Sequence, residues 1–181
     1  MTLVSREGAG GGRTLRMMKP GSERSRRHQA AVLGAFVAVC LAAGVVGSIA
    51  TTPQIPTWYA SLNKPSWSPP NWVFAPVWTT LYVMMGAAAW LVWRKVDAPY
   101  ERVFLWFWIQ LALNTIWSFI FFALEQPGLA FAEIILLWLS IAATLGAFRK
   151  CSRVAALLLT PYLGWVSFAA YLNFTIWRLN Q

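Results

Sequence analysis

Residues 58–82 read WYASLNKPSWSPPNWVFAPVWTTLY, and this stretch decides the fold of the chain. It carries four tryptophans and four prolines around a single lysine, Lys64, and it continues directly into a long apolar segment. A loop of a soluble protein does not expose that much contiguous aromatic surface unless it binds something. A rigid, aromatic-rich loop beside a membrane has this composition, so the stretch predicts a membrane protein.

The composition of the whole chain agrees with this prediction. The 181 residues are 58% hydrophobic and only 12% charged, whereas about a quarter of the residues are charged in soluble proteins. Several apolar segments approach or exceed the roughly 18 residues that a spanning helix needs. Five spans are predicted, at residues 31–50, 72–93, 103–124, 129–148 and 154–177. None alternates in polarity as a barrel strand would. We therefore predict an all-α integral membrane protein with one five-transmembrane-helix bundle.

The distribution of positive charge predicts the orientation of the bundle. With five spans, the N-terminus and the second and fourth loops share one side. Thirteen Lys and Arg residues belong to that side, and the other side holds only Lys64 and Arg178. This bias predicts a multi-pass protein with a cytoplasmic N-terminus. The formal charge of +9 thus reflects topology, and we expect the lipid bilayer rather than nucleic acid as the partner.

Residues 1–28 differ from the rest of the chain. They are rich in Gly, Ser and Arg and contain little that a core could bury. Such a composition cannot offset the entropy of ordering, so we predict a disordered basic tail before a membrane domain at residues 29–181. The tail is rich in Arg and poor in acid, as transit peptides are, but it contains no clear amphipathic helix.

The side chains offer little for catalysis or metal binding. Cys40 lies in the middle of a predicted span and Cys151 in a turn, and the only histidine is His28, in the tail. No CxxC motif or Cys/His cluster is present to hold a metal. With a single histidine, the chain also has almost no side chain suited to acid–base catalysis by histidine. We expect no metal, no cofactor and no catalytic set, which favours a binding protein over an enzyme.

Three of the predicted spans each place large aromatic and polar residues on one face, by helical spacing. The faces comprise Phe74, Trp78, Leu81, Tyr82 and Met85 in the second span; Gln110, Asn114, Trp117 and Phe121, with Ser118 at the margin, in the third; and Pro161, Trp165, Ala169 and Leu172, close to Asn173, in the fifth. Facing one another, they would line a flat and largely apolar slot. Ligand pockets between the helices of bundles have this character.

The tryptophans divide into two groups. Six lie near predicted span ends and fit an interfacial belt or a covering loop: Trp58, Trp67, Trp72, Trp93, Trp106 and Trp177. Trp78, Trp117 and Trp165 lie farther inside, where an indole N–H needs a partner that Asn114 can supply. Asn114 itself fits two roles, a polar link between helices or a ligand-binding group.

Three further features have alternative interpretations. Glu133, inside the fourth span, is a functional candidate, but near a helix N-terminus it can also be stabilised by the helix dipole and reach the interface. The small-residue pairs Ala43/Gly47 and Gly44/Ser48 allow close helix approach, either within the bundle or between protomers. Pro161 removes a backbone donor and is expected to kink the fifth span.

The sequence resembles the TspO/translocator-protein family over roughly residues 31–180. Three signatures carry the resemblance, in the family's order and spacing. The first is the run from Trp58-Tyr59 through Lys64-Pro65, Trp67 and Pro69-Pro70 to Val77-Trp78 and Leu81-Tyr82. The second is Gln110-Leu-Ala-Leu-Asn114-Thr-Ile-Trp117 followed by Phe121-Phe122, and the third is Pro161-Tyr-Leu-Gly-Trp165 with Leu172-Asn173 and Trp177-Arg178.

The resemblance implies a five-helix bundle, commonly a homodimer, that binds porphyrins and other tetrapyrroles, sterols and synthetic ligands in a pocket closed by the first loop. It places Trp78, Asn114, Trp117, Trp165, Ala169 and Leu172 in that pocket, with Phe74 and Ala75 where the second helix meets ligand. Trp78 and Trp165 match tryptophans linked in bacterial members to light-dependent porphyrin breakdown. The proposed sterol-recognition pattern of animal members has a tyrosine where this chain has Phe174.

Three functions follow as hypotheses. The first is a tetrapyrrole-binding membrane protein that acts as sensor, carrier or scavenger. The second is a transporter of small molecules or sterols, against which stands the shortage of buried ionisable groups and of paired broken helices. The third is an enzyme that degrades porphyrin photo-oxidatively, with Trp78 and Trp165 as the photochemical residues.

Overall fold

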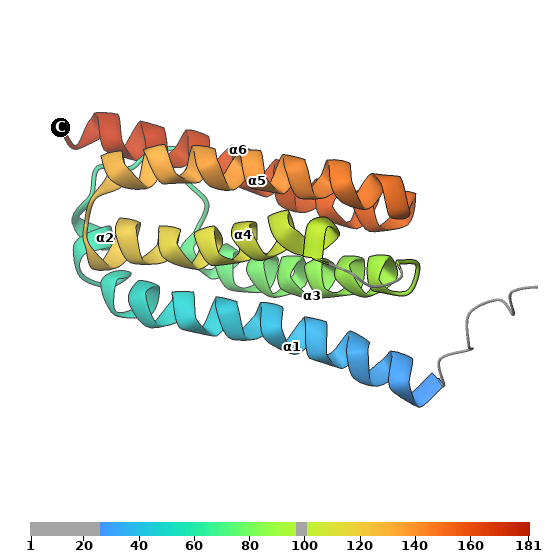
Figure 1. Ribbon diagram of the computed structural model, residues 1–181. Helices are drawn as coiled ribbons and strands as arrows, with labels where there is room; N and C mark the ends of the chain where they lie inside the picture. The colour runs from blue at the N-terminus through green and yellow to red at the C-terminus, as the bar shows by residue number, and fades with distance from the viewer. Residues whose placement is uncertain (1–25, 97–100) are drawn as a thin grey trace, which may run out of the picture.

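The computed structural model describes residues 26–96 and 101–181, and within these ranges the chain is helical and contains no strand (Figure 1). The long helices are α1 (Arg26–Thr51), α3 (Phe74–Trp93), α4 (Glu101–Ser118), α5 (Pro127–Cys151) and α6 (Arg153–Leu179). The short ones are η1 (Thr52–Gln54), α2 (Trp58–Ser61), η2 (Asn71–Val73) and the π-helical turn η3 (Phe119–Ala123).

The predicted bundle of five transmembrane helices is confirmed. Five helical segments are long and apolar enough to cross a membrane, and they coincide with the predicted spans apart from a few residues at their ends. One boundary differs at the N-terminus, because α1 begins at Arg26 and so includes the last three residues of the predicted tail. Arg and Gln are good helix formers, and the His28 ring packs 5.6 Å from the Trp93 ring. The rest of the tail lies outside the described residues.

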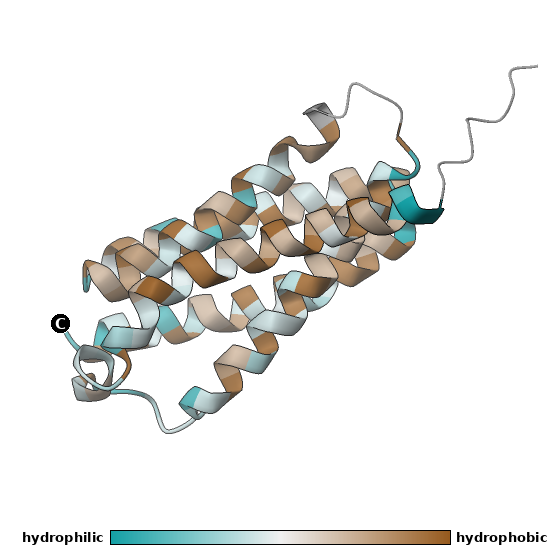
Figure 2. Cartoon of the chain, turned by 90° about the horizontal axis from the view of Figure 1, so that it is seen from below, coloured by the Kyte–Doolittle hydropathy of each residue, from teal (hydrophilic) through white to brown (hydrophobic). Residues whose placement is uncertain are grey.

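The long helices run side by side in alternating directions (Figure 1). α5 packs between α6 and α4, α1 packs on α3 and α4, and α3 also contacts α6. The centre of the bundle is filled by fully buried side chains such as Met85, Phe107, Phe148 and Tyr162. Apolar residues also cover the outer faces of the helices, as expected for surfaces in lipid, whereas the start of α1 is strongly hydrophilic (Figure 2).

Small residues let α1 pack closely inside the bundle. A Cβ atom on Gly86 of α3 would lie 2.7 Å from the Val37 Cα of α1, and one on Gly47 would lie 3.1 Å from the Ser118 Oγ of α4. A Cβ atom on Gly44 would meet the Tyr82 ring. Of the two interpretations of the small-residue pairs in this helix, Gly44 and Gly47 therefore support packing within the protomer.

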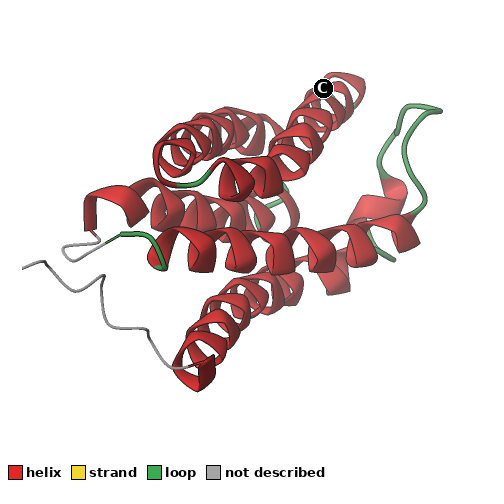
Figure 3. Ribbon diagram, turned by 90° about the vertical axis from the view of Figure 1, so that its right-hand side faces the viewer, coloured by secondary structure: helices red, strands yellow, loops and turns green. Residues whose placement is uncertain are grey.

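Positive charge gathers at one end of the bundle. The described residues of that end lie at the start of α1, after α3 and around the turn between α5 and α6: Arg26, Arg27, Arg94, Lys95, Arg149, Lys150 and Arg153. Lys64 and Arg178 lie at the opposite end, together with the long connection between α2 and α3, which Figure 3 draws in green. Both cysteines are free, Cys40 buried within α1 and Cys151 at the basic end.

Candidate functional site

A cavity of about 560 Å³ lies between the long helices at the end of the bundle that carries the first loop. All eight residues predicted to contact a ligand line this cavity: Phe74, Ala75, Trp78, Asn114, Trp117, Trp165, Ala169 and Leu172. They come from three helices that are far apart in the sequence. Their proximity in space is thus a finding, whereas their contact with a ligand stays a prediction.

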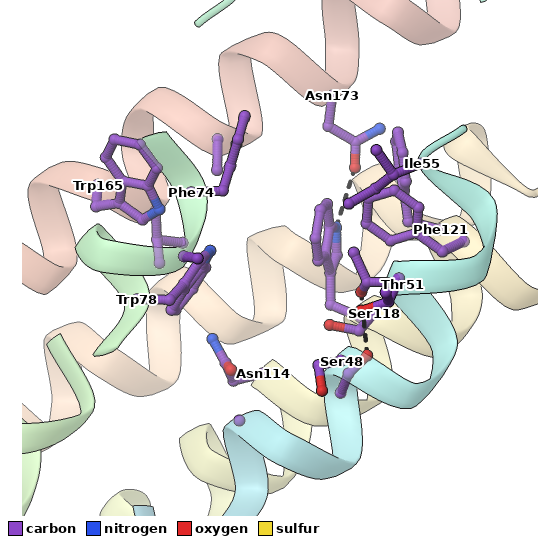
Figure 4. Close-up of a pocket in the computed structure, with 18 of the residues that line it drawn as sticks. Ser48, Thr51, Ile55, Phe74, Trp78, Asn114, Ser118, Phe121, Trp165 and Asn173 are labelled. Atoms are coloured by element: carbon purple, nitrogen blue, oxygen red, sulfur yellow. Dashed lines mark hydrogen bonds between the residues drawn. The ribbon is translucent and has the colours of Figure 1, made fainter. Parts of the chain in front are cut away.

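Aromatic rings form the wall of the cavity on the side of α3 and α6. The Phe74 and Trp165 rings meet edge to face with centroids 5.9 Å apart, and the Trp78 ring lies 5.6 Å from Tyr82. Figure 4 shows Phe74, Trp78 and Trp165 grouped on one side and Ser48, Thr51 and Phe121 on the other. A flat conjugated molecule would find large aromatic faces on the first side.

Asn114 lies at the floor of the cavity and joins three helices. Its Oδ1 accepts a hydrogen bond from the Tyr82 hydroxyl of α3 at 2.6 Å, and its Nδ2 donates to the Tyr162 hydroxyl of α6 at 3.2 Å. An amide has two N–H groups and two lone pairs, so these bonds leave it one of each. Asn114 is therefore a polar link between helices, and it retains hydrogen-bonding capacity at the cavity wall.

The inner tryptophans differ in how their N–H groups are satisfied. The Trp117 indole donates to Asn173 Oδ1 at 3.1 Å, and Asn173 Nδ2 donates to the Pro127 carbonyl at 2.8 Å. Asn173, and not Asn114 as predicted, is the partner of this indole. The Trp165 Nε1 is buried without a hydrogen-bond partner among the described residues, although its side chain lines the cavity. An unsatisfied buried donor of this kind needs an explanation, and a hydrogen bond to a bound ligand would provide one.

Four residues of the predicted faces do not line the cavity: Leu81 and Met85, which are buried in the core, and Gln110 and Pro161. Gln110 is buried but does not line the cavity, and its Nε2 lies 3.8 Å from the Met85 Sδ. Pro161 is exposed, and α6 continues through it as a helix. The buried stripe of α6 advances by alternate steps of four and three residues: Ala155, Leu159, Tyr162, Val166 and, farther on, Asn173 and Ile176.

Steps of four and three residues are the ordinary spacing of one face of an α-helix. The prediction extended a single row back from Trp165 to Pro161, which is why it missed Tyr162. The hydroxyl of a tyrosine in the middle of an apolar span needs a hydrogen-bond partner. This requirement could have identified Tyr162 as a residue that faces a neighbouring helix.

The wall of the cavity on the side of α1 was not predicted. Ser48 and Thr51 of α1 line the cavity together with Ser118 of α4. The Ser48 hydroxyl donates to the Val45 carbonyl at 2.7 Å, and the Thr51 hydroxyl donates to the Gly47 carbonyl at 3.0 Å. Their lone pairs thus make this wall polar without any charge. The small-residue pairs of α1 were the signal that this helix lies close to α4.

Glu133 does not belong to the cavity wall. Its side chain is 7% exposed, and both carboxyl oxygens are buried without a hydrogen-bond partner among the described residues. The interpretation in which this carboxyl group reaches the interface is therefore wrong. Within the described ranges, no group of His, Cys, Asp or Glu side chains is arranged to hold a metal ion.

The first loop closes the cavity at one end of the bundle. Ile55, Tyr59 and Asn71 contribute to the lining. The π-helical turn η3 brings the adjacent residues Phe121 and Phe122 inward, and the Tyr59 ring lies 5.6 Å from Phe122. Burial raises the pKa of Tyr59 above its ordinary value, so its hydroxyl stays neutral.

The tryptophans of this region take both predicted positions. Trp58 packs on Phe121 and Phe122 and Trp67 stacks on Tyr171, so both belong to the cover, whereas Trp72 is 74% exposed, as a belt residue would be.

Comparison with known proteins gives consistent matches. The model of the TspO/MBR family matches residues 36–178. The chain is 46% identical to the Tryptophan-rich protein TspO of Chlorobaculum tepidum, over 84% of this chain and 98% of that protein. It is 44% identical to the Translocator protein of Homo sapiens, over 68% of this chain and 75% of that protein. It is 39% identical to the Tryptophan-rich sensory protein of Cereibacter sphaeroides, over 80% of this chain and 89% of that protein.

Proposed function

The chain belongs to the TspO/MBR family, and from this premise we propose that it is a membrane-embedded tetrapyrrole-binding protein that acts as sensor, carrier or scavenger. One observation carries the proposal: the cavity combines an uncharged aromatic wall with the unpartnered N–H of Trp165. A porphyrin ring presents a flat π-face to such a wall, and its carboxylate side groups are acceptors for such a donor. The volume of the cavity falls in the usual range for sites that bury small molecules.

Titration of the purified protein with protoporphyrin IX tests this proposal. We expect saturable quenching of tryptophan fluorescence with about one porphyrin per chain, because the inner indoles lie at the cavity wall. Non-specific partitioning into detergent would give quenching that rises without saturation, and that result would contradict the proposal.

Transport of a small molecule or a sterol is the alternative function. The name of the human relative, Translocator protein, favours it, whereas the name Tryptophan-rich sensory protein favours a sensor. Phe174 stands where the sterol pattern has a tyrosine, and this favours a tetrapyrrole over a sterol. A flux assay in liposomes separates the two functions, because a sensor binds ligand without moving it across the bilayer.

The orientation in the bilayer belongs to the same proposal. If positive charge sets the topology, Cys151 lies in the cytoplasm with Arg149, Lys150 and Arg153, and Lys64 lies on the other side. A membrane-impermeant thiol reagent is then expected to label Cys151 only after the cells are opened. Cys40 is fully buried and is expected to contribute no background. Labelling of Cys151 in intact cells would reverse the orientation.

The proposal includes a second copy of the chain. The family resemblance implies a homodimer in the bilayer. The mass of the protein in lipid nanodiscs at low protein concentration measures this directly, since a dimer has twice the 20.3 kDa of one chain. A mass of one chain under these conditions would contradict the dimer and leave the cavity, which lies within one chain, unaffected.

A further inference from the structure

The loop that closes the cavity, residues 55–73, is attached to the bundle on two sides, and we name it the lid. On one side it meets η3, and on the other it meets α6. The two attachments differ in chemistry, and the difference indicates on which side the lid opens.

The attachment to η3 is apolar and buried. Tyr59 is 5% exposed and packs on Phe121 and Phe122, both of which are also buried. The Trp58 ring meets the Phe121 ring edge to face at 5.5 Å. Breaking this attachment would expose a large apolar area to water or headgroups, at about 25 cal/mol for each Å².

The attachment to α6 is more exposed, and it combines hydrogen bonds with contacts of the Trp67 ring to Phe168 and Tyr171. The Asn63 N–H donates to Asn180 Oδ1 at 2.9 Å, and Asn180 Nδ2 donates back to the Asn63 carbonyl at 3.0 Å. Asn180 Nδ2 also donates to the Ile176 carbonyl at 2.7 Å, which fixes this side chain at the end of α6. Farther along the lid, the Trp67 ring stacks on the exposed Tyr171 ring at 5.1 Å. Water can replace exposed hydrogen bonds at little net cost.

Lys64 makes the start of the lid a single unit. Its Nζ donates to the Tyr59 carbonyl at 2.6 Å and to the Leu62 carbonyl at 3.0 Å. The same ammonium group lies 4.9 Å from the centre of the Tyr59 ring. Residues 59–64 are thereby tied together, so release of Asn63 would move this segment as a unit about its buried aromatic contact.

We infer that Asn180 is the positioning residue that latches the lid, and that the cavity opens between the lid and α6 with the Tyr59 contact as the pivot. The inference deepens the proposed function, because a ligand in the cavity would be retained by this latch. Its geometry stands independently of the ligand: one side chain makes a pair of hydrogen bonds to a residue 117 positions away in the sequence.

A labelling experiment tests the latch without any ligand. In a background of Cys40→Ala and Cys151→Ser, an Ala169→Cys substitution places a thiol in the cavity wall. Adding Asn180→Ala is expected to raise the rate at which a small polar thiol reagent labels this position by about fivefold, because both hydrogen bonds that join Asn180 to Asn63 of the lid are lost. Gln181→Ala is the matched control, since Gln181 bonds only Arg178 among the described contacts at the same helix end.

Two outcomes would overturn the inference. One is an equal labelling rate in the Asn180→Ala and Gln181→Ala proteins. The other is a larger increase from Phe122→Ala than from Asn180→Ala in proteins of equal melting temperature, because the lid would then open on the η3 side.

A second measurement follows the ligand. The dissociation rate of protoporphyrin IX is expected to rise about fivefold in Asn180→Ala and less in Asn180→Asp, which retains the acceptor for the Asn63 N–H. An unchanged dissociation rate in a protein that binds porphyrin would contradict the latch. If the parent protein binds no porphyrin, the proposed function fails, and the labelling experiment still decides the latch.

Discussion

Replacing Trp78 and Trp165 together with phenylalanine is expected to abolish most of the light-dependent loss of bound protoporphyrin IX while weakening binding only modestly. Both side chains line the cavity, and phenylalanine keeps an aromatic wall there. The substitution removes the more easily oxidised indole rings and the unpartnered N–H of Trp165. Absorbance of the bound porphyrin under illumination, compared with a dark sample, measures the effect.

Trp72 provides the control for this prediction. It is 74% exposed and lies outside the cavity lining, so Trp72→Phe is expected to leave both photodegradation and affinity nearly unchanged. Equal photodegradation in the double variant and the parent would remove indole chemistry from the account and leave a passive binding protein. Loss of photodegradation in Trp72→Phe would contradict the division of the tryptophans into belt and cavity.

Asn114→Leu is expected to lower the affinity for protoporphyrin IX by about 1–2 kcal/mol, a typical cost of losing a hydrogen bond in a binding site. The structure adds a second effect. Leucine leaves the hydroxyls of Tyr82 and Tyr162 without the partner that now joins α3, α4 and α6. We therefore expect a lower melting temperature as well, because both hydroxyls are buried.

Tyr162→Phe separates the two roles of Asn114. Tyr162 is fully buried behind the cavity and does not line it, so its hydroxyl acts only through Asn114. This variant is expected to lower the melting temperature and to keep most of the affinity. Unchanged affinity in a folded Asn114→Leu protein would show that Asn114 is a structural link alone.

Apolar length and helical spacing were sufficient to predict the bundle and one wall of its cavity. A spanning helix must satisfy its own backbone, so runs of about 20 apolar residues specify the five spans without tertiary information. Phe74 and Trp78 are four residues apart on one helix face, and they do line the cavity. Helical spacing also placed Ala169 and Leu172 on the inward face of the fifth span, and the family resemblance alone supplied Ala75.

Features that depend on how helices meet were not predictable in this way. Tyr162 lies on the buried stripe of α6, one position along the chain from the row through Pro161 that the prediction used. The pairing of Trp117 with Asn173 depends on how far α4 and α6 are shifted along each other. The residue pattern of a single helix does not determine that shift. The latch joins Asn63 to Asn180, and an exposed asparagine near the end of a chain carries no periodic signal.

The most direct test of the central claim is whether filling this cavity removes porphyrin binding. Ala169→Phe adds a ring at the cavity wall, and Ala38→Phe makes the same substitution on the exposed outer face of α1. In a fluorescence titration with protoporphyrin IX, the account predicts that Ala169→Phe loses at least about tenfold in affinity and that Ala38→Phe binds like the parent. Parental affinity in a folded Ala169→Phe protein would contradict the account, because the porphyrin would then bind elsewhere.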